Sequence, residues 1–582
     1  MLQPSVPHGP GLVSIEAGFT VIASVLVLAW PRIGFSFFRG IERSLGWLAR
    51  RKSLAVLSVG LSALILRLAI LPMCPIPQPF VMGDFSFLLA ADTFAHGRLT
   101  NPTPAMWMHF ESAHIAMQPT YMSMYFPAQG LFMAAGKILL GNPWFGVLIS
   151  CALMCAAICW MLQAWLPPGW AMLGGALAVL RLDLFSYWIN TYMGGGAIGA
   201  LGGALVLGAL PRLMKTSRTR YGLLMAVGVV LLALTRPFEG LLLCLPVSAV
   251  LGYWALFGKN RPPVAVLVRR AAAPLALIVA AGAWLGYYDY RAFDNPFTLP
   301  YTVARNTYAV VPFFVWQPLR PTPIYRHTEL RRFYSENEVV SYTQEHSLSA
   351  FVPRTLTKFS WELKFFACFA LLPPLVMLRR VFLDRRVRFL VLCLPLWLGG
   401  MAAGVFLFPH YMAPFTAAFY ALGLQAMRHL RLWKLEGKPA GLTLVRLLVT
   451  LCLAMAGLRL FADPLHLTPA EFPVGEWVVW WSGPGHFGTE RAQVNAQLEQ
   501  LPARQLAIVR YTPGHNCEDE WVYNGADIDN SKVIWAREMD AKSNLELIKY
   551  YKDRQVWLVQ PDIPSDKVSP YPIPEQQAGI TH

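Results

Sequence analysis

Long apolar stretches separated by short polar segments dominate the chain between residues 11 and 461. Many of these stretches hold about 20 residues with few charges, the length a helix needs to cross the roughly 30 Å hydrocarbon core of a bilayer. The pattern predicts an α-helical polytopic membrane protein with about twelve transmembrane helices. The expected spans are 11–31, 53–73, 144–165, 169–189, 194–213, 221–236, 238–257, 271–289, 361–380, 387–408, 410–428 and 441–461.

Three polar segments are long enough to carry a functional site. Residues 74–143 and 290–360 form loops, and residues 462–582 form a tail. Within the first loop, the apolar run 128–141 is too short to cross a bilayer, so we expect an interfacial helix there. The chain divides into an N-terminal span with a basic loop, a transmembrane core and the tail. Their expected bounds are 1–52, 53–461 and 462–582.

The tail has the pattern of a small folded domain. Strand-like runs occupy 505–511, 532–536 and 555–559, and a helical stretch at 541–552 precedes the last run. Strand, helix and strand in succession predict a small α/β domain. Because the tail follows the external end of the last expected span, we expect this domain to be extracytoplasmic.

Positive charge is concentrated between the spans. The chain has 49 Lys and Arg residues against 33 Asp and Glu, a formal net charge of +16. This surplus lies in short loops, which indicates the cytoplasmic side of a membrane protein and not a nucleic-acid-binding surface. An even number of spans then places both termini outside. No Asn-X-Ser/Thr motif with X other than Pro occurs, which favours a bacterial inner membrane. The basic loops are 32–52, 212–220, 259–270, 379–388 and 428–438.

Two acidic residues follow the second span. Asp84 stands about ten residues beyond it, at a membrane boundary where a carboxylate is costly and therefore marks a candidate site. It is the best candidate for a general base, because such a base must meet an acceptor at the membrane surface. Alternatively, Asp84 caps a helix over 85–96. Asp92 lies near the same helix face and is either a second catalytic residue or the partner of a nearby arginine.

Glu111 and His114 lie further along the first loop. They are three residues apart and could share one helix face. We expect both to contribute to substrate binding, since a carboxylate and an imidazole can each hydrogen-bond a polar ligand.

Arginines on the external side are candidates for binding a phosphate. Arg236 lies in the turn TRPFEG (235–240) between two spans, where its planar guanidinium suits a lipid phosphate. Equally, its side chain could extend to the headgroups. The 290–360 loop adds Arg305, Arg320 and Arg326 among Tyr and Trp residues, and this combination fits the phosphate and sugar of a polyprenyl-phosphate sugar. The alternative is a basic, aromatic interfacial loop.

Aromatic residues lie at the external ends of other spans. Trp188 and Tyr192 belong to SYWINTYMGGG (186–196), next to a glycine run that permits close backbone packing. His410 and Tyr411 belong to FPHYMAP (408–414). All four are candidates for substrate binding, although each aromatic taken alone also fits an interfacial belt.

These segments together resemble the GT-C glycosyltransferases. More narrowly, they resemble a bacterial group related to the protein O-mannosyltransferase and aminoarabinose-transferase families. The matching segments occur in order within residues 53–430. They are GDFSFLLAADTFAHGRLTNP (83–102), YFPAQG (125–130), LPYTVARNTYAVVPFFVWQ (299–317) and PHYMAP (409–414).

The chain departs from this family at its acidic pair. An Asp-Glu pair is usual in the family, and Gly83-Asp84 stands there in this chain. Either Asp84 alone serves, or the protein has changed its substrate or lost its activity.

The resemblance implies an enzyme that moves a sugar from a polyprenyl-phosphate donor to an envelope lipid, glycan or protein on the external face. Asp84 would deprotonate the acceptor, and attack at C1 would displace the lipid phosphate with inversion. One carboxylate is a weak metal site, so no metal or other cofactor is expected. A transporter of lipid-linked sugar is an alternative, and it requires ionisable residues at mid-span, such as Arg67, Arg181 and Asp183. A non-catalytic envelope scaffold is another.

Overall fold

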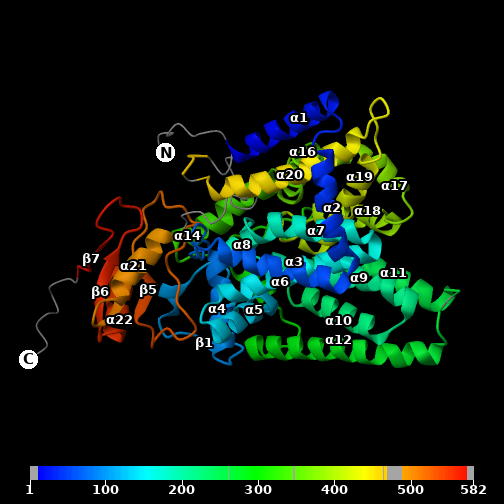
Figure 1. The fold of residues 1–582 in the computed structure, drawn as a ribbon. Coiled ribbons are helices and arrows are strands. Elements are labelled where there is room, and N and C mark those ends of the chain that lie inside the picture. Colours follow the sequence, from blue (N-terminus) through cyan, green and yellow to red (C-terminus); the bar gives the residue numbers. More distant parts are fainter. Residues whose placement is uncertain (1–10, 260, 345–347, 463, 468–487, 573–582) are drawn as a thin grey trace, which may run out of the picture.

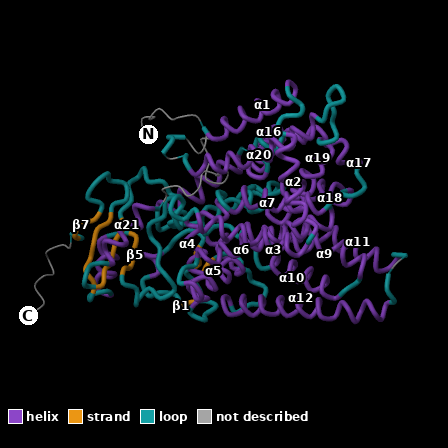
Figure 2. The backbone as a smooth tube through the Cα atoms, viewed as in Figure 1, coloured by secondary structure: helices purple, strands orange, loops and turns teal. Residues whose placement is uncertain are grey.

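A helical body and a smaller domain built on a sheet make up the protein (Figure 1, Figure 2). The computed structural model describes the chain except for residues 1–10, 260, 345–347, 463, 468–487 and 573–582. The helical body lies to the right in Figure 1, and the sheet domain lies at its left end.

Seven helices among the described residues are long and apolar enough to cross a membrane. Each falls on an expected span, and two shorter apolar helices fall on two more. The membrane character of the chain is therefore supported, while the number twelve stays a prediction. The seven are α1 (Leu12–Ala29), α3 (Lys52–Ala69), α6 (Trp144–Trp165), α9 (Gly196–Thr216), α11 (Pro237–Phe257), α12 (Val264–Phe293) and α20 (Ala440–Leu460); the shorter two are α10 (Thr219–Ala233) and α18 (Arg388–Ala402).

Two expected spans are not continuous helices. In the segment 361–380, α16 ends at Phe366 and a turn follows in which Cys368 has φ +47°. Pro373 and Pro374 then begin a separate 3-10 turn, at positions where a missing N–H costs no hydrogen bond. The segment 169–189 breaks at a π-helical turn that carries Arg181 and Asp183. The pieces are α7 (Pro168–Ala178), the π turn (Val179–Asp183), α8 (Tyr187–Asn190), α16 (Leu348–Phe366), the 3-10 turn (Pro373–Met377) and α17 (Leu378–Leu383); α19 (Thr416–Leu430) follows α18.

The first loop folds against the end of the helical body. It contains two helices and a small antiparallel sheet in the order β1-β3-β2. The expected interfacial helix is present as α5. These elements are α4 (Met82–Ala95), β1 (Asn101–Pro102), a 3-10 turn (Trp107–Phe110), β2 (Ile115–Ala116), β3 (Thr120–Ser123) and α5 (Pro127–Leu140); the second loop contains α13 (Pro300–Tyr308), α14 (Thr328–Arg331), a π turn (Arg332–Asn337) and α15 (Glu338–Thr343).

The tail contains the predicted α/β domain. Its strands run in the order β5-β4-β6-β7, with β5, β4 and β6 parallel and β7 antiparallel to β6. Leu506 of the central strand lies opposite Ile534 on one side and Val556 on the other. The elements are α21 (Thr489–Glu499), β4 (Arg504–Val509), β5 (Val533–Arg537), α22 (Ala541–Tyr550), β6 (Arg554–Val559) and β7 (Val568–Pro570).

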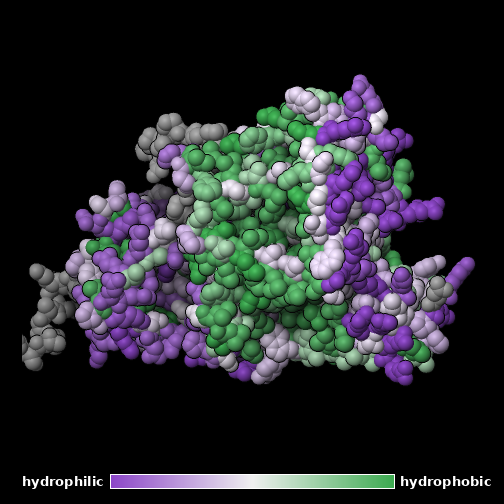
Figure 3. Space-filling view, viewed as in Figure 1, coloured by the Kyte–Doolittle hydropathy of each residue, from purple (hydrophilic) through white to green (hydrophobic). Residues whose placement is uncertain are grey.

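The surface of the helical body carries a broad apolar band between two polar ends (Figure 3). The C-terminal domain forms one polar end. The basic helix α2 (Phe35–Arg50) lies along the other (Figure 1). An apolar band of this kind suits the hydrocarbon core of a membrane. It places the C-terminal domain outside that core, and which end faces the cytoplasm stays a prediction.

Candidate functional site

Asp84 holds the backbone of the turn that joins α8 to α9. Its Oδ1 accepts a hydrogen bond from the N–H of Tyr192 at 2.9 Å, and its Oδ2 accepts one from the N–H of Phe80 at 3.2 Å. Asp84 lies in the first turn of α4, and Val81 occupies the N-cap position. The alternative that Asp84 caps a helix starting at residue 85 is therefore wrong, because α4 begins at Met82.

The environment of Asp84 suits a proton acceptor. The side chain is 2% exposed, and burial raises the pKa of its carboxyl to about 6 against the lowering effect of the backbone N–H donors. A Cβ at Gly83 would lie 2.9 Å from the sulfur of Met193. A side chain at position 83 would therefore require the flexible end of Met193 to move.

Arg236 holds the same turn from the opposite direction. It occupies the N-cap position of α11, and its Nη2 donates a hydrogen bond to the carbonyl of Gly194 at 2.8 Å. Its guanidinium lies 4.4 Å from the centre of the Tyr411 ring, a cation–π distance. Arg236 therefore contacts the protein interior and does not simply extend to lipid headgroups. It brings a positive charge to the segment that Asp84 contacts.

The histidine and aromatic residues predicted for this region line the turn. Trp188, Tyr192 and His410 are buried inside the helical body, so the interfacial-belt alternative is wrong for them. The Nδ1 atom of His410 lies 2.7 Å from the hydroxyl of Tyr187. Gly194 has φ +92°, and a Cβ there would lie 2.9 Å from the His410 ring. The ring thus packs directly on the turn.

His114 reaches the same region through Tyr125. The Tyr125 hydroxyl lies 3.1 Å from His114 Nδ1, and the Tyr125 ring stacks on Phe87 at 4.3 Å. Burial lowers the pKa of His114 to about 3, so the imidazole is neutral at physiological pH and can accept the Tyr125 proton in a hydrogen bond. Tyr125 was not among the predicted site residues, although it lies in a segment that carries the family resemblance.

Glu111 and Arg326 form a second cluster. Glu111 Oε1 accepts hydrogen bonds from the Tyr308 hydroxyl at 2.8 Å and from Arg326 Nη1 at 3.2 Å. Burial raises the pKa of Glu111, while Tyr308 and Arg326 lower it. Glu111 follows the 3-10 turn and His114 has φ +66°, so the prediction that they share a helix face is wrong.

Arg305 and Arg320 both bind groups of the second loop. Arg305 is buried and donates to Glu338 at 2.6 Å and to the carbonyl of Val311 at 2.7 Å. Arg320 donates to the carbonyl of Arg305 at 3.0 Å. Both arginines are engaged in holding the second loop together, which a linear pattern of basic residues cannot reveal.

Asp92 anchors the C-terminal domain. It forms an ion pair with Lys137 of α5, and its Oδ2 accepts a hydrogen bond from the N–H of Ala526 at 2.7 Å. His96 lies 3.4 Å away on the same helix. The predicted arginine partner is therefore wrong, because the cation is a lysine. Asp84, by contrast, binds the turn between α8 and α9.

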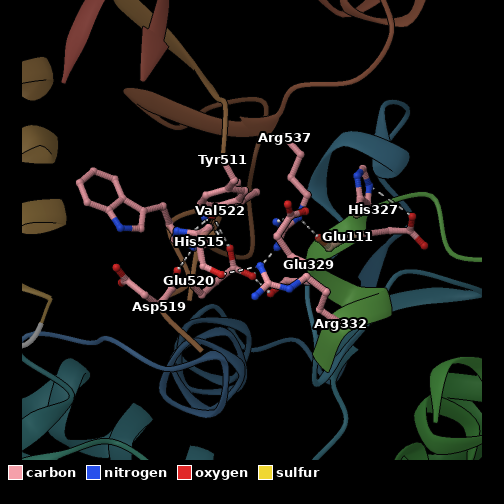
Figure 4. A network of polar contacts seen from close by, with 12 residues as sticks. Glu111, His327, Glu329, Arg332, Tyr511, His515, Asp519, Glu520, Val522 and Arg537 are labelled. Atoms are coloured by element: carbon pink, nitrogen blue, oxygen red, sulfur yellow. Dashed lines mark hydrogen bonds and ion pairs between the residues drawn. The ribbon is translucent and has the colours of Figure 1, made fainter. Parts of the chain in front are cut away.

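Arg537 at the end of β5 links the C-terminal domain to the first and second loops (Figure 4). It donates to the carboxylate of Glu520 and, from Nε, to the carbonyl of Glu111 at 2.7 Å. Its Nη1 lies 3.6 Å from Glu329. Arg332 adds a hydrogen bond to the carbonyl of His515 at 2.7 Å. No linear motif in the sequence connects these residues.

Metal ligands and thiols add nothing further to the site. Within the part of the chain that the structure describes, no group of three or more His, Cys, Asp or Glu residues could hold a metal ion. No disulfide joins Cys74 to Cys517.

No protein-family model matches the chain, and no curated protein matches it in sequence. Solved structures of two proteins resemble it in fold. ArnT from Cupriavidus metallidurans in the apo state is 14% identical, with a TM-score of 0.46 over 89% of this chain and 94% of that chain. The same protein bound to undecaprenyl phosphate is 13% identical, with a TM-score of 0.42 over 89% of this chain and 93% of that chain.

The oligosaccharyltransferase of Archaeoglobus fulgidus is a second neighbour. Tethered to an acceptor peptide, it is 11% identical, with a TM-score of 0.39 over 78% of this chain. This chain covers 62% of that protein's length. TM-scores below 0.5 at such low identity do not establish an activity, so the function must come from the residues of this chain.

Proposed function

We propose that the protein is a glycosyltransferase of the external membrane face. It transfers a sugar from a polyprenyl-phosphate donor to an envelope acceptor, with Asp84 as the general base. The supporting observation is that a carboxylate and a guanidinium both hydrogen-bond the backbone of one short turn. Asp84 accepts from the N–H of Tyr192, and Arg236 donates to the carbonyl of Gly194, two residues further on. Base and phosphate-binding cation are thereby fixed relative to each other.

Backbone N–H groups surround the carboxylate of Asp84. Those of Phe80 and Tyr192 donate to it at 3.2 and 2.9 Å, and those of Val81 and Met193 also act to lower its pKa. A pKa of about 6 lies near the operating pH, where a general base works best. In the proposed step, Asp84 takes the proton of the acceptor hydroxyl or amine. The freed lone pair forms a bond to C1 of the sugar.

The leaving group of this reaction is the lipid phosphate. The bond between C1 and the phosphate oxygen breaks as the new bond forms on the opposite face, so the configuration at C1 inverts. The electron pair stays on the phosphate, and the positive charge of Arg236 offsets it. No protonated acid is needed at the leaving oxygen, because a charge-matched phosphate leaves readily.

One buried ion-pair network lies inside the helical body. Glu16 of α1 pairs with Arg459 of α20 at 2.9 Å and lies 3.6 Å from Arg181 of the π turn. This network joins three segments of the body and gives Arg181 a structural partner. The buried carboxylate of Asp183, a second residue of the π turn, is not part of it.

The site and the C-terminal domain are proposed to face the outside of a bacterial inner membrane. Both termini would then lie outside. The basic loops, including the one that contains α2, would face the cytoplasm, as the positive-inside pattern predicts.

The test is a mass-spectrometric comparison of envelope glycans and polyprenyl-phosphate sugars. Three strains are compared: wild type, a deletion of this gene, and the deletion complemented with the wild-type gene. The proposal predicts that one glycan is lost in the deletion, that its lipid-linked sugar accumulates, and that complementation reverses both. Unchanged glycans and lipid-linked sugars in the deletion would contradict it.

A further inference from the structure

A pocket of about 240 Å³ lies between the first and second external loops. Its lining includes Trp107, Glu111 and Gln118 from the first loop and Thr307, Tyr308 and Arg326 from the second. Gln118 and Thr307 are exposed, so the pocket opens to solvent. Its polar centre does not contact the turn held by Asp84 and Arg236.

The two charged groups in this pocket compensate each other. Arg326 Nη1 lies 3.2 Å from Glu111 Oε1 and 3.5 Å from Oε2. A ligand therefore meets a pair with no net charge, which attracts neither an anion nor a cation strongly. The pair still offers carboxylate acceptors and guanidinium donors side by side, the combination that binds adjacent hydroxyl groups.

Arg326 retains donors for a ligand. The side chain is 45% exposed, and among the described residues its hydrogen bonds come from Nη1 alone. The guanidinium lies 4.7 Å from the centre of the Trp107 ring, which fixes the orientation of its plane. The remaining N–H groups of this fixed fork are therefore available at the pocket.

Glu111 is held through both its carboxylate and its backbone. The Tyr308 hydroxyl donates to Oε1 at 2.8 Å, and Arg326 Nη1 donates to the same oxygen at 3.2 Å. The backbone carbonyl of Glu111 accepts from Arg537 of the C-terminal domain. A polar group locked by packing and hydrogen bonds is the arrangement that a specific binding site requires.

We propose that this pocket binds one neutral sugar ring, with Glu111 and Arg326 hydrogen-bonding its hydroxyl groups. The volume lies below the roughly 300–1,000 Å³ of pockets for drug-sized ligands, which fits a single ring and not a longer glycan. We assign the ring to the acceptor, and this assignment rests on the proposed function. The binding of a neutral sugar ring to the pocket does not depend on it.

The test is saturation-transfer NMR on the full-length protein in lipid nanodiscs, which avoids detergents with sugar headgroups. The probes are neutral methyl hexosides, a hexosamine and a hexose phosphate. The neutral glycosides should receive saturation from the wild type, and Arg326→Ala should weaken their binding about tenfold or more through the loss of charged hydrogen bonds. Arg331→Ala is the matched control, since Arg331 is an exposed arginine that pairs with Glu336.

Several results would overturn the inference. These are the absence of neutral-glycoside binding to the wild type, equal binding to Arg326→Ala and Arg331→Ala, or binding of the hexose phosphate alone. Because Arg326 is half exposed, its replacement should leave the fold intact. Asp84→Asn should bind the glycosides normally. If it does, and the deletion strain nevertheless keeps its glycans unchanged, the sugar-binding pocket is supported and the proposed transferase activity is contradicted.

Discussion

The carboxylate of Asp84 accepts a hydrogen bond from the backbone N–H of Tyr192, 2.9 Å away and 108 residues later in the chain. This bond joins the loop of residues 74–143 to the turn before α9. Arg236 then bonds Gly194 in that turn. Three segments predicted separately from the sequence thus meet at one place, and the consequences can be tested.

The pH dependence of sugar transfer should report the state of Asp84. Its pKa is raised to about 6, and only the ionised carboxylate can accept a proton from the acceptor. We expect the transfer rate in membrane vesicles to be constant well above pH 6 and to fall as the pH drops through about 6. A rate that stays constant down to about pH 4 would exclude a base with this pKa.

Replacement of Arg236 should weaken use of the donor. Arg236→Met removes the charge that offsets the lipid phosphate, and we expect kcat/KM for the donor to fall about 10- to 100-fold. Arg236→Lys should recover part of the loss, because it restores charge without the planar fork. The control is Arg220→Met, an exposed arginine whose recorded partner is the neighbouring Tyr221. Equal kcat/KM values in Arg236→Met and the control would contradict this role.

Gly194 should tolerate no side chain. Its φ is +92°, and an added Cβ would lie 2.9 Å from the His410 ring. Gly194→Ala should therefore displace the turn, lower the transfer rate and destabilise the protein by about 1–3 kcal/mol. The matched control is Gly423→Ala in α19, where an added Cβ meets nothing within 4 Å. Transfer assays and thermal unfolding compare the two; wild-type behaviour of Gly194→Ala would refute the close packing.

Asp92 should matter for attachment of the C-terminal domain. Its pKa is lowered by Lys137 and the N–H of Ala526, despite the opposing effect of burial. The ionised form is thus stabilised in the folded protein, so this contribution is present above the unfolded pKa of about 3.9 and is lost as the pH falls below it.

Asp92→Asn should therefore loosen the domain at neutral pH, by about 1 kcal/mol given the partial exposure of Lys137. Limited proteolysis and hydrogen exchange around Ala526 measure the effect. Glu499→Gln serves as the control, because Glu499 is exposed and its recorded partner is Asn495 on the same helix. Identical protection in both variants would show that Asp92 does not anchor the domain.

The sequence predicts the membrane helices and the α/β tail well, because hydrophobic length and strand periodicity are local signals. It also identifies Asp84, Arg236, Tyr192 and His410, which the fold brings to one turn. It fails at 361–380, where composition resembles a span but the helix ends at Phe366 and the chain turns before Pro373.

Partners across the chain account for the other differences. The neighbouring sequence does not distinguish Arg305, which forms an ion pair with Glu338, from Arg326, which lines a pocket. The bond from Arg537 to the carbonyl of Glu111 joins residues 426 apart in sequence, and no periodic pattern encodes it. Such contacts exist only once the domains dock.

The most direct measurement of the central claim is complementation of the deletion strain with Asp84→Asn, scored by mass spectrometry of lipid-linked sugars and envelope glycans. An equal amount of folded protein in the membrane is the necessary control. We predict that Asp84→Asn leaves the lipid-linked sugar accumulated and the glycan absent, as in the deletion. Full restoration of the glycan by Asp84→Asn would contradict the account, because it would show that the carboxylate is not the base of the reaction.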